Sequence, residues 1–168
     1  MRLSFDRLEG DRFETMAPLD SALRKQPEVT APAYRAAPHN IEAEQALLGA
    51  ILVNNEALYR VSDFLEPHHL FEPIHQQIYD ISRSLIRTGK LASPVTLKTF
   101  LPADIDIAGL TPSQYLARLA AEATTIINAV DYGRTVYDLA VRRELIQIGE
   151  DMVNVAFDAP VDFAPRDQ

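Results

Sequence analysis

Apolar residues recur at helical spacing along most of the chain from residue 40 onward. The first stripe consists of Leu47, Leu48, Ile51 and Leu52. These positions share one face of a helix. Asn40 precedes the stripe and can cap a free backbone N–H of the first turn. Glu42 and Glu44 fall in that turn, where the helix dipole favours acids. The pattern predicts a helix that begins after Asn40.

Two further helices follow from the same spacing. A short one fits residues 55–63, with inward residues Leu58, Val61 and Phe64. A longer one begins near Pro73 and carries Ile74, Ile78, Ile81 and Leu85 on one face. Arg87, Gly89 and Lys90 supply signals for its C-terminal end.

Two more helices are predicted from a shared start signal, a capping hydroxyl followed by proline at the first helical position. Ser93-Pro94 opens a helix that holds Val95, Leu97 and Leu101. Thr111-Pro112 opens a helix that holds Tyr115, Leu116 and Leu119. Residues 102–110, which lie between them, read as an irregular acidic loop.

The longest periodic stretch runs from about Asn128 to Phe157 and can be one helix or a hairpin. Its stripe is Tyr137, Val141, Leu145, Ile148, Met152 and Val155. Further apolar residues lie off this stripe, and a helix that is apolar on more than one face buries the surplus elsewhere, commonly in another subunit. Packing of one helix on its own domain is the ordinary alternative. The candidate protein–protein interface comprises Tyr132, Val136, Tyr137, Val141, Arg143, Ile146, Ile148 and Met152.

No strand-like alternation is visible, so the predicted fold is all-α. We expect a compact orthogonal bundle of about five to six short helices, a globular head, followed by a long helix or helical hairpin. The head spans about residues 39–122 and the long element about 126–158. The proline-containing residues 1–38 are predicted to be a disordered tail, and residues 159–168 the start of a linker.

The charge is concentrated on the predicted helical body. The 168-residue chain has a net charge of −8. The first 38 residues carry six bases and six acids, so the excess of acids lies in the remainder. An acidic body repels phosphate backbones, which indicates that any contact with DNA is indirect. The chain has no cysteine, no secretory signal and no apolar run of membrane-spanning length, so we expect a soluble, cytoplasmic protein.

No catalytic or cofactor-binding residue is predicted. A phosphate loop needs the pattern G-x-x-x-x-G-K-S/T, because its backbone N–H groups wrap the phosphates. The one Gly-Lys pair, Gly89-Lys90, has Ser84 in place of the first glycine and Leu91 in place of the hydroxyl residue. There is no G-x-S-x-G motif, so a hydrolytic site has no support in the sequence either.

We predict structural rather than catalytic or metal-binding roles for the histidines and the paired carboxylates. His68, His69 and His75 lie near Glu66, Glu72 and Asp80, but their spacing matches no metal-ligand pattern on one helix face. We therefore predict no metal site and assign His75 to capping or packing. The pairs Glu42/Glu44 and Glu150/Asp151 are predicted to lie on solvated helix faces.

The order of these features resembles the N-terminal domain of the DnaB family of bacterial replicative helicases. Four segments carry the resemblance over about residues 38–150. They are the run from Pro38 through Leu58, the run Phe71–Tyr79, the segment Pro94–Leu97, and Ile127–Tyr132 leading to Arg143–Ile146. There are two departures: the usual aspartate before Val95 is replaced around Ser93-Pro94, and the family's Gly-Gly-x-Tyr-Leu segment appears here as Thr111–Leu116.

The resemblance implies an assembly role. In that family the domain forms a collar on a hexameric ring, with a globular head followed by a helical hairpin, here from residues 128–157. The collar packs against copies of itself, recruits primase and in some lineages communicates with a helicase loader. The resemblance also implies that ATP and magnesium belong to an ATPase motor domain absent from this chain, so the chain itself is expected not to be an enzyme.

Two other functions compete with the helicase collar. A free-standing helical adaptor would use the same long element without helicase activity. A small all-α DNA-binding protein would need a basic recognition helix, which the acidic body argues against.

Overall fold

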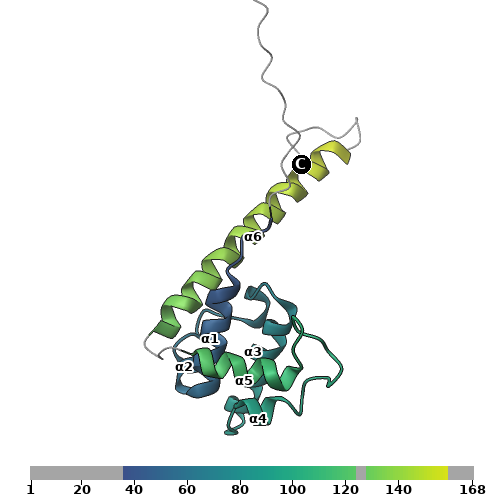
Figure 1. Cartoon of the computed structure of the whole chain (residues 1–168). Coiled ribbons are helices and arrows are strands. Elements are labelled where there is room, and N and C mark those ends of the chain that lie inside the picture. The colour runs from purple at the N-terminus through teal and green to yellow at the C-terminus, as the bar shows by residue number, and fades with distance from the viewer. Residues whose placement is uncertain (1–35, 124–127, 159–168) are drawn as a thin grey trace, which may run out of the picture. The chain divides into compact units, whose positions relative to one another are not determined.

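The computed structural model describes residues 36–123 and 128–158. The helices are α1 (Ile41–Val53), α2 (Glu56–Tyr59), the 3-10 turn η1 (Pro67–His69), α3 (Pro73–Arg87), α4 (Pro94–Leu97), α5 (Pro112–Glu122) and α6 (Ala129–Asp158). Within those two ranges, extended backbone pairs only at the isolated bridge between Ile107 and Leu110. The all-α prediction is confirmed. The elements from α1 to α5, residues 36–123, are called the head below (Figure 1).

α1 is the central helix of the head. It starts as predicted, because the Asn40 side chain accepts a hydrogen bond of 3.0 Å from the Ala43 N–H. It packs against α3, α5 and α6, and its predicted apolar stripe is fully buried. A Cβ atom at Gly49 would collide with the carbonyl oxygen of Leu119 in α5. Only glycine therefore permits the close approach of α1 and α5.

The two hydroxyl–proline starts are confirmed as capping boxes. At α4, the Ser93 hydroxyl accepts from the Thr96 N–H and the Thr96 hydroxyl accepts from the Ser93 N–H. Thr111 and Gln114 make the equivalent pair of hydrogen bonds at α5. Each box satisfies two backbone donors at a helix start that have no partner within the helix.

Two helices are shorter than the periodicity predicted. Helix α2 ends at Tyr59, and the chain continues as turns to Phe64. In these turns the Leu58 carbonyl accepts hydrogen bonds from both the Val61 and the Ser62 N–H groups. α4 ends at Leu97. Leu101 is buried beyond the end of that helix, just before the helix-disfavouring Pro102, and Val95 is exposed rather than inward.

α6 is a single helix of 30 residues. Of the two predicted alternatives for residues 128–157, one long helix or a hairpin, the structure has the single helix. No proline or turn signal interrupts it, and its two glycines are tolerated within a helix. The residues that face the head are small or β-branched: Ala129, Gly133, Val136 and Ala140.

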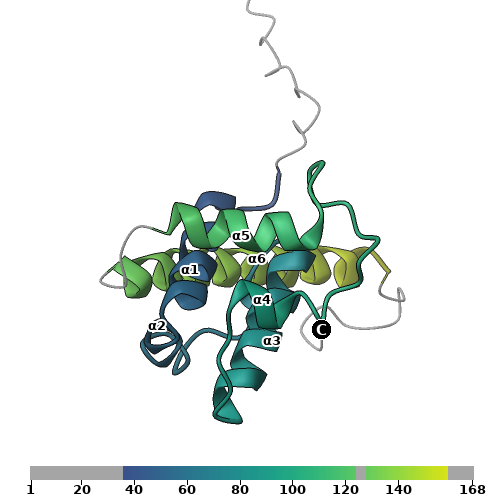
Figure 2. The ribbon, with the colours of Figure 1, turned by 60° about the horizontal axis from the view of Figure 1, so that its bottom comes forward.

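The second half of α6 extends beyond the head (Figure 1), and Figure 2 shows α6 passing behind α1. No helix among the described residues combines the length and the apolar composition that a membrane crossing needs. The predicted tail up to residue 35 and the predicted linker at 159–168 lie outside the described residues.

The two glycines of α6 should respond oppositely to alanine. At Gly133 a Cβ would lie 2.8 Å from Cγ1 of Val61, whereas at Gly149 it would meet nothing within 4 Å. Overpacking should make Gly133→Ala less stable by about 1–3 kcal/mol. Gly149→Ala should be more stable by about 0.5–1 kcal/mol, because alanine loses less backbone entropy in a helix. Urea unfolding of both variants checks this, and a stabilised Gly133→Ala would contradict the close approach of α6 to the head.

Candidate protein–protein interface

Arg143 marks the point where α6 leaves the head. Its guanidinium donates hydrogen bonds to the carbonyl oxygens of Pro38, at 2.8 Å, and His69, at 2.6 Å. The same group lies 5.5 Å from the centre of the Phe71 ring, on which His39 stacks at 4.3 Å. One side chain thus ties α6 to η1 and to the segment that enters α1.

Aromatic contacts hold the preceding turns of α6. The Tyr137 ring meets Phe64 and His69 edge-on, with ring centres 5.9 and 5.0 Å apart. The guanidinium of Arg134 lies over the Phe64 ring, 5.0 Å from its centre. The first half of α6 is therefore fixed on the head by both small-residue packing and aromatic contacts.

Beyond Arg143, α6 carries a continuous apolar surface that no other described residue covers. We call it the α6 apolar face: Leu145, Ile146, Ile148, Met152, Val153, Val155 and Phe157, each between 47 and 84% exposed. At 100° per residue these side chains occupy about 200° of the helix circumference. Gly149 lies near the middle of this arc, in a shallow groove between Ile146 and Val153. Such a surface is typical of a site that binds another protein.

The eight predicted interface residues separate into three groups. Val136 is buried in the head, and the partly buried Tyr132 and Tyr137 pack against its core. Val141 and Arg143 are half-buried at the boundary. Ile146, Ile148 and Met152 belong to the α6 apolar face. Sequence periodicity missed this division because it does not show where the head ends.

The head contains a buried polar chain that sequence reasoning also missed. Glu44 in α1 is 1% exposed. Its carboxylate accepts hydrogen bonds from the Phe71 N–H at 2.5 Å and from Nδ1 of His75 at 2.6 Å. His75 Nε2 then accepts from the Tyr115 hydroxyl at 2.5 Å, and that oxygen accepts from the Gln45 amide at 3.1 Å. Burial raises the pKa of Tyr115, which keeps the hydroxyl protonated as this chain requires.

The predicted solvated position of Glu44 is therefore wrong, whereas Glu42 is exposed as predicted. The periodicity held the signal, because residue 44 precedes Leu47 and Leu48 by three and four positions and shares their buried face. His75 is confirmed as a packing residue. The network joins α1, α3 and α5 in the interior, where it has no access to a substrate.

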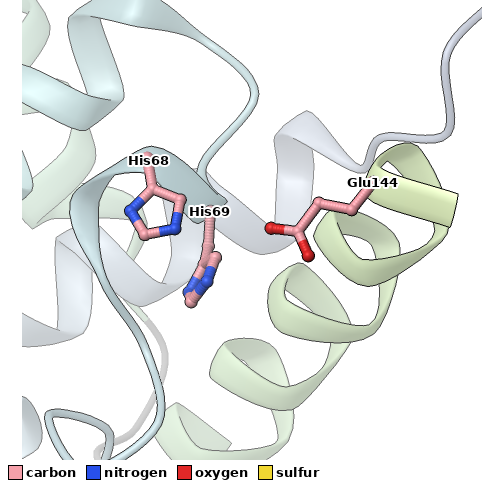
Figure 3. A group of neighbouring side chains, drawn as sticks. All are labelled: His68, His69 and Glu144. Atoms are coloured by element: carbon pink, nitrogen blue, oxygen red, sulfur yellow. The ribbon is translucent and has the colours of Figure 1, made fainter. Parts of the chain in front are cut away.

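The structure places Glu144 of α6 opposite His68 and His69 of η1 (Figure 3). Their potential ligand atoms all lie within 4.8 Å of one another. Sequence proximity had suggested Glu66 and Glu72 instead as neighbours of these histidines. Glu66 forms a bidentate ion pair with Arg83, which lowers the pKa of Glu66 through the hydrogen bonds.

The hydrogen bonding of His69 disfavours this group as a metal centre. Its Nδ1 accepts a hydrogen bond of 2.9 Å from the Glu66 N–H, so a neutral ring carries its proton on Nε2. A cation at Nε2 would have to displace that proton. Burial, with a smaller contribution from the charge of His68, lowers the pKa of His69. The geometry fits a neutral histidine that caps the η1 turn.

The family comparison decides what kind of domain carries these surfaces. The family model described as "DnaB-like helicase N terminal domain" matches residues 36–138. The chain belongs to this family. The match covers the whole head and the first part of α6.

Relatives of this DnaB-type domain agree with the match. The replicative DNA helicase DnaB of Rickettsia felis is 43% identical over 149 residues, which are 89% of this chain and 30% of the relative. That of Rickettsia typhi is 47% identical over 134 residues, 80% of this chain and 27% of the relative. The chain thus spans less than a third of the length of these helicases.

Solved structures share the fold. The N-terminal domain of the Mycobacterium tuberculosis DnaB helicase superposes with a TM-score of 0.68 at 27% identity, over 77% of this chain and 90% of that one. The N-terminal domain of the Helicobacter pylori helicase, described with its interactions with primase, gives 0.58 at 19% identity over 68 and 89% of the two chains. The latter supports the fold alone.

Removal of the buried carboxylate should destabilise the domain strongly. Glu44→Ala leaves the Phe71 N–H and the His75 ring without their acceptor, so we expect a loss of about 3 kcal/mol in the free energy of unfolding. The matched control is Glu42→Ala, two positions earlier in the same turn and exposed, which should change stability by less than about 0.5 kcal/mol. Equal effects of the two variants in chemical denaturation would show that Glu44 is not structural.

His69 should make stability depend on pH in a defined window. Because its pKa is lowered from 6.5 in the fold, the unfolded chain binds the proton first. The contribution of neutral His69 to the free energy of unfolding is fully present above pH 6.5. It is lost as the pH falls from 6.5 towards the lower pKa of His69 in the folded state. His69→Asn keeps an acceptor for the Glu66 N–H and should lose less stability than the wild type between roughly pH 7.5 and pH 5.5. Identical slopes for the two proteins would refute a neutral, buried His69.

Proposed function

We propose that this domain assembles the subunits of a replicative DNA helicase through the α6 apolar face. The observation that carries the proposal is the abrupt change at Arg143. Before it, α6 is packed on the head; after it, seven large apolar side chains on one helix lie open to solvent. A helix with this surface needs a partner to bury it.

The size of the α6 apolar face is comparable with what association requires. Burial of the exposed part of each side chain is worth on the order of 1 kcal/mol. A two-fold symmetric contact buries the seven side chains of both copies, which gives a favourable free energy of roughly 14 kcal/mol. The entropic and desolvation cost of association is about 4–15 kcal/mol. One copy facing a polar partner would supply only half of the gain. A second copy of the chain is therefore the favoured partner.

The family membership extends the proposal to a collar on a hexameric ring that docks primase, with a helicase loader as a further partner. Relatives at 43 and 47% identity are replicative helicases, and the Helicobacter pylori domain is described with its interactions with primase. This chain spans about 30% of such a helicase, so ATP and magnesium would be bound by the remainder. With a net charge of −8 the domain would meet DNA only through its parent protein, in the cytoplasm.

A free-standing adaptor that uses the same face is the alternative. The sequence identity with replicative helicases favours the helicase-assembly function over the adaptor. The matched region covers 89% of this chain and so includes residues beyond the head.

The assembly proposal predicts that Ile148→Asp combined with Met152→Asp yields a folded monomer. Both side chains are more than half exposed, so their replacement leaves the head intact and places two charges in the contact. The matched control is Gln147→Asp with Asn154→Asp, on the polar side of the same helix, which should self-associate like the wild type. Sedimentation equilibrium gives the mass and circular dichroism confirms the helix content. A wild type that stays monomeric up to roughly 0.1 mM, a Kd too weak for a stable contact, would overturn the proposal.

A further inference from the structure

A second apolar surface lies on the head, between the end of α3 and α4. This α3–α4 groove is lined by Leu85, Lys90, Leu91, Val95, Thr96, Thr99 and Phe100. Three of its large side chains are mainly exposed: Leu91 at 66%, Val95 at 68% and Phe100 at 56%. In Figure 1, α4 lies at the end of the head far from the C-terminal half of α6, so the two surfaces are separate.

Local hydrogen bonds hold the walls of the groove in place. The Asn55 side chain exchanges two hydrogen bonds with the backbone of Ala92, at 2.7 and 3.0 Å. The Thr96 hydroxyl donates to the Leu91 carbonyl at 2.8 Å. Leu97, which is fully buried, anchors α4 in the core. Val95 and Phe100 are thus presented outward by a fixed turn, as in a preformed binding surface.

The charge around the groove is opposite to that of the domain. No Asp or Glu occurs between Asp80 and Asp104, although the chain has 24 acidic residues. The basic residues of this stretch are Arg83, which pairs with Glu66, then Arg87, Lys90 and Lys98. Lys90 lines the groove, and Lys98 is the C-cap of α4, between the lining residues Thr96 and Thr99 in the sequence. These two are the only lysines in the sequence between residues 36 and 158. Neither lysine forms an ion pair with any residue that the structure describes. An apolar groove beside unpaired cations complements an amphipathic segment with acidic residues.

We propose that the α3–α4 groove binds a short acidic amphipathic segment of another protein. Leucine- or phenylalanine-type side chains of the segment fill the space beside Leu91, Val95 and Phe100. Its carboxylates face Lys90 and Lys98. The proposal does not depend on the α6 apolar face, because the two surfaces share no residue.

Single-stranded nucleic acid is the less favoured ligand for the same cations. Strand-binding sites combine a basic groove with several aromatic stacking platforms. Here Phe100 is the one aromatic residue of the lining, and the chain as a whole carries a charge of −8. The aliphatic lining fits apolar side chains better than bases.

The test uses a labelled synthetic peptide and the complete 168-residue chain. The peptide carries Leu and Phe at helical i, i+3, i+4, i+7 spacing and Glu or Asp at the remaining positions. Fluorescence anisotropy should give a Kd on the order of 10–100 µM that weakens with added salt. A peptide with Lys in place of every acid should not bind. No binding of the acidic peptide at about 1 mM, or equal binding of the basic one, would overturn the proposal.

Variants locate the contact. Lys90→Glu with Lys98→Glu should weaken peptide binding at least about tenfold, a loss of roughly 1.4 kcal/mol. Arg60→Glu with Arg142→Glu makes the same change of net charge at exposed positions outside the groove and should bind like the wild type. If both double variants lose the same binding affinity for the peptide, the effect comes from net charge alone and the proposed site is wrong.

Two further outcomes would assign the groove to a different occupant. If Lys90→Glu with Lys98→Glu lowers the mass of the oligomer measured by sedimentation without peptide, the groove is a contact between copies of the chain. If an oligothymidine strand binds as tightly as the peptide and depends on the same lysines, the groove is a nucleic-acid site. Either result overturns the acidic-peptide proposal while leaving the α6 contact to be judged by its own variants.

Discussion

The carboxylate of Glu44 is a charge on the central helix with almost no access to water, and it must be matched by donors from other segments. The Phe71 N–H and His75 supply them, and His75 in turn accepts from Tyr115. This requirement fixes α1, α3 and α5 relative to one another, since a shifted helix would leave a buried charge unpaired. Leucines at the neighbouring positions supply the driving force for burial, whereas the polar chain specifies one arrangement of them.

The same fixed head determines where α6 is supported. The Phe71 backbone that bonds Glu44 also positions the ring over which Arg143 lies, so the internal network and the exit point of α6 are adjacent along the chain. Alanine and glycine on the first half of α6 allow contact over a wide area. Past Glu144, which faces His68 and His69, the large apolar side chains of α6 from Leu145 to Phe157 are exposed to solvent. The residues of α6 that pack on the head and the α6 apolar face therefore lie on different sides of the helix as well as on different halves of it.

The two exposed apolar surfaces differ in charge. The α6 apolar face is flanked by acids, with no base after Arg143 up to Asp158, whereas the α3–α4 groove is flanked by lysines. Charges of opposite sign beside the two surfaces favour different partners, because electrostatic complementarity contributes to the specificity of an interface.

The sequence by itself determined the helical class, the capped starts at Asn40, Ser93 and Thr111, the inward stripe of α1 and the absence of a phosphate loop. These features depend on neighbours within about four residues, which periodicity and capping chemistry describe. Only the tertiary structure decided that Glu44 is buried, that Glu144 faces His69 and that Arg143 bonds the backbone of Pro38 and His69. Each of these depends on segments about 25 to 100 residues apart, and no local pattern encodes which of them meet.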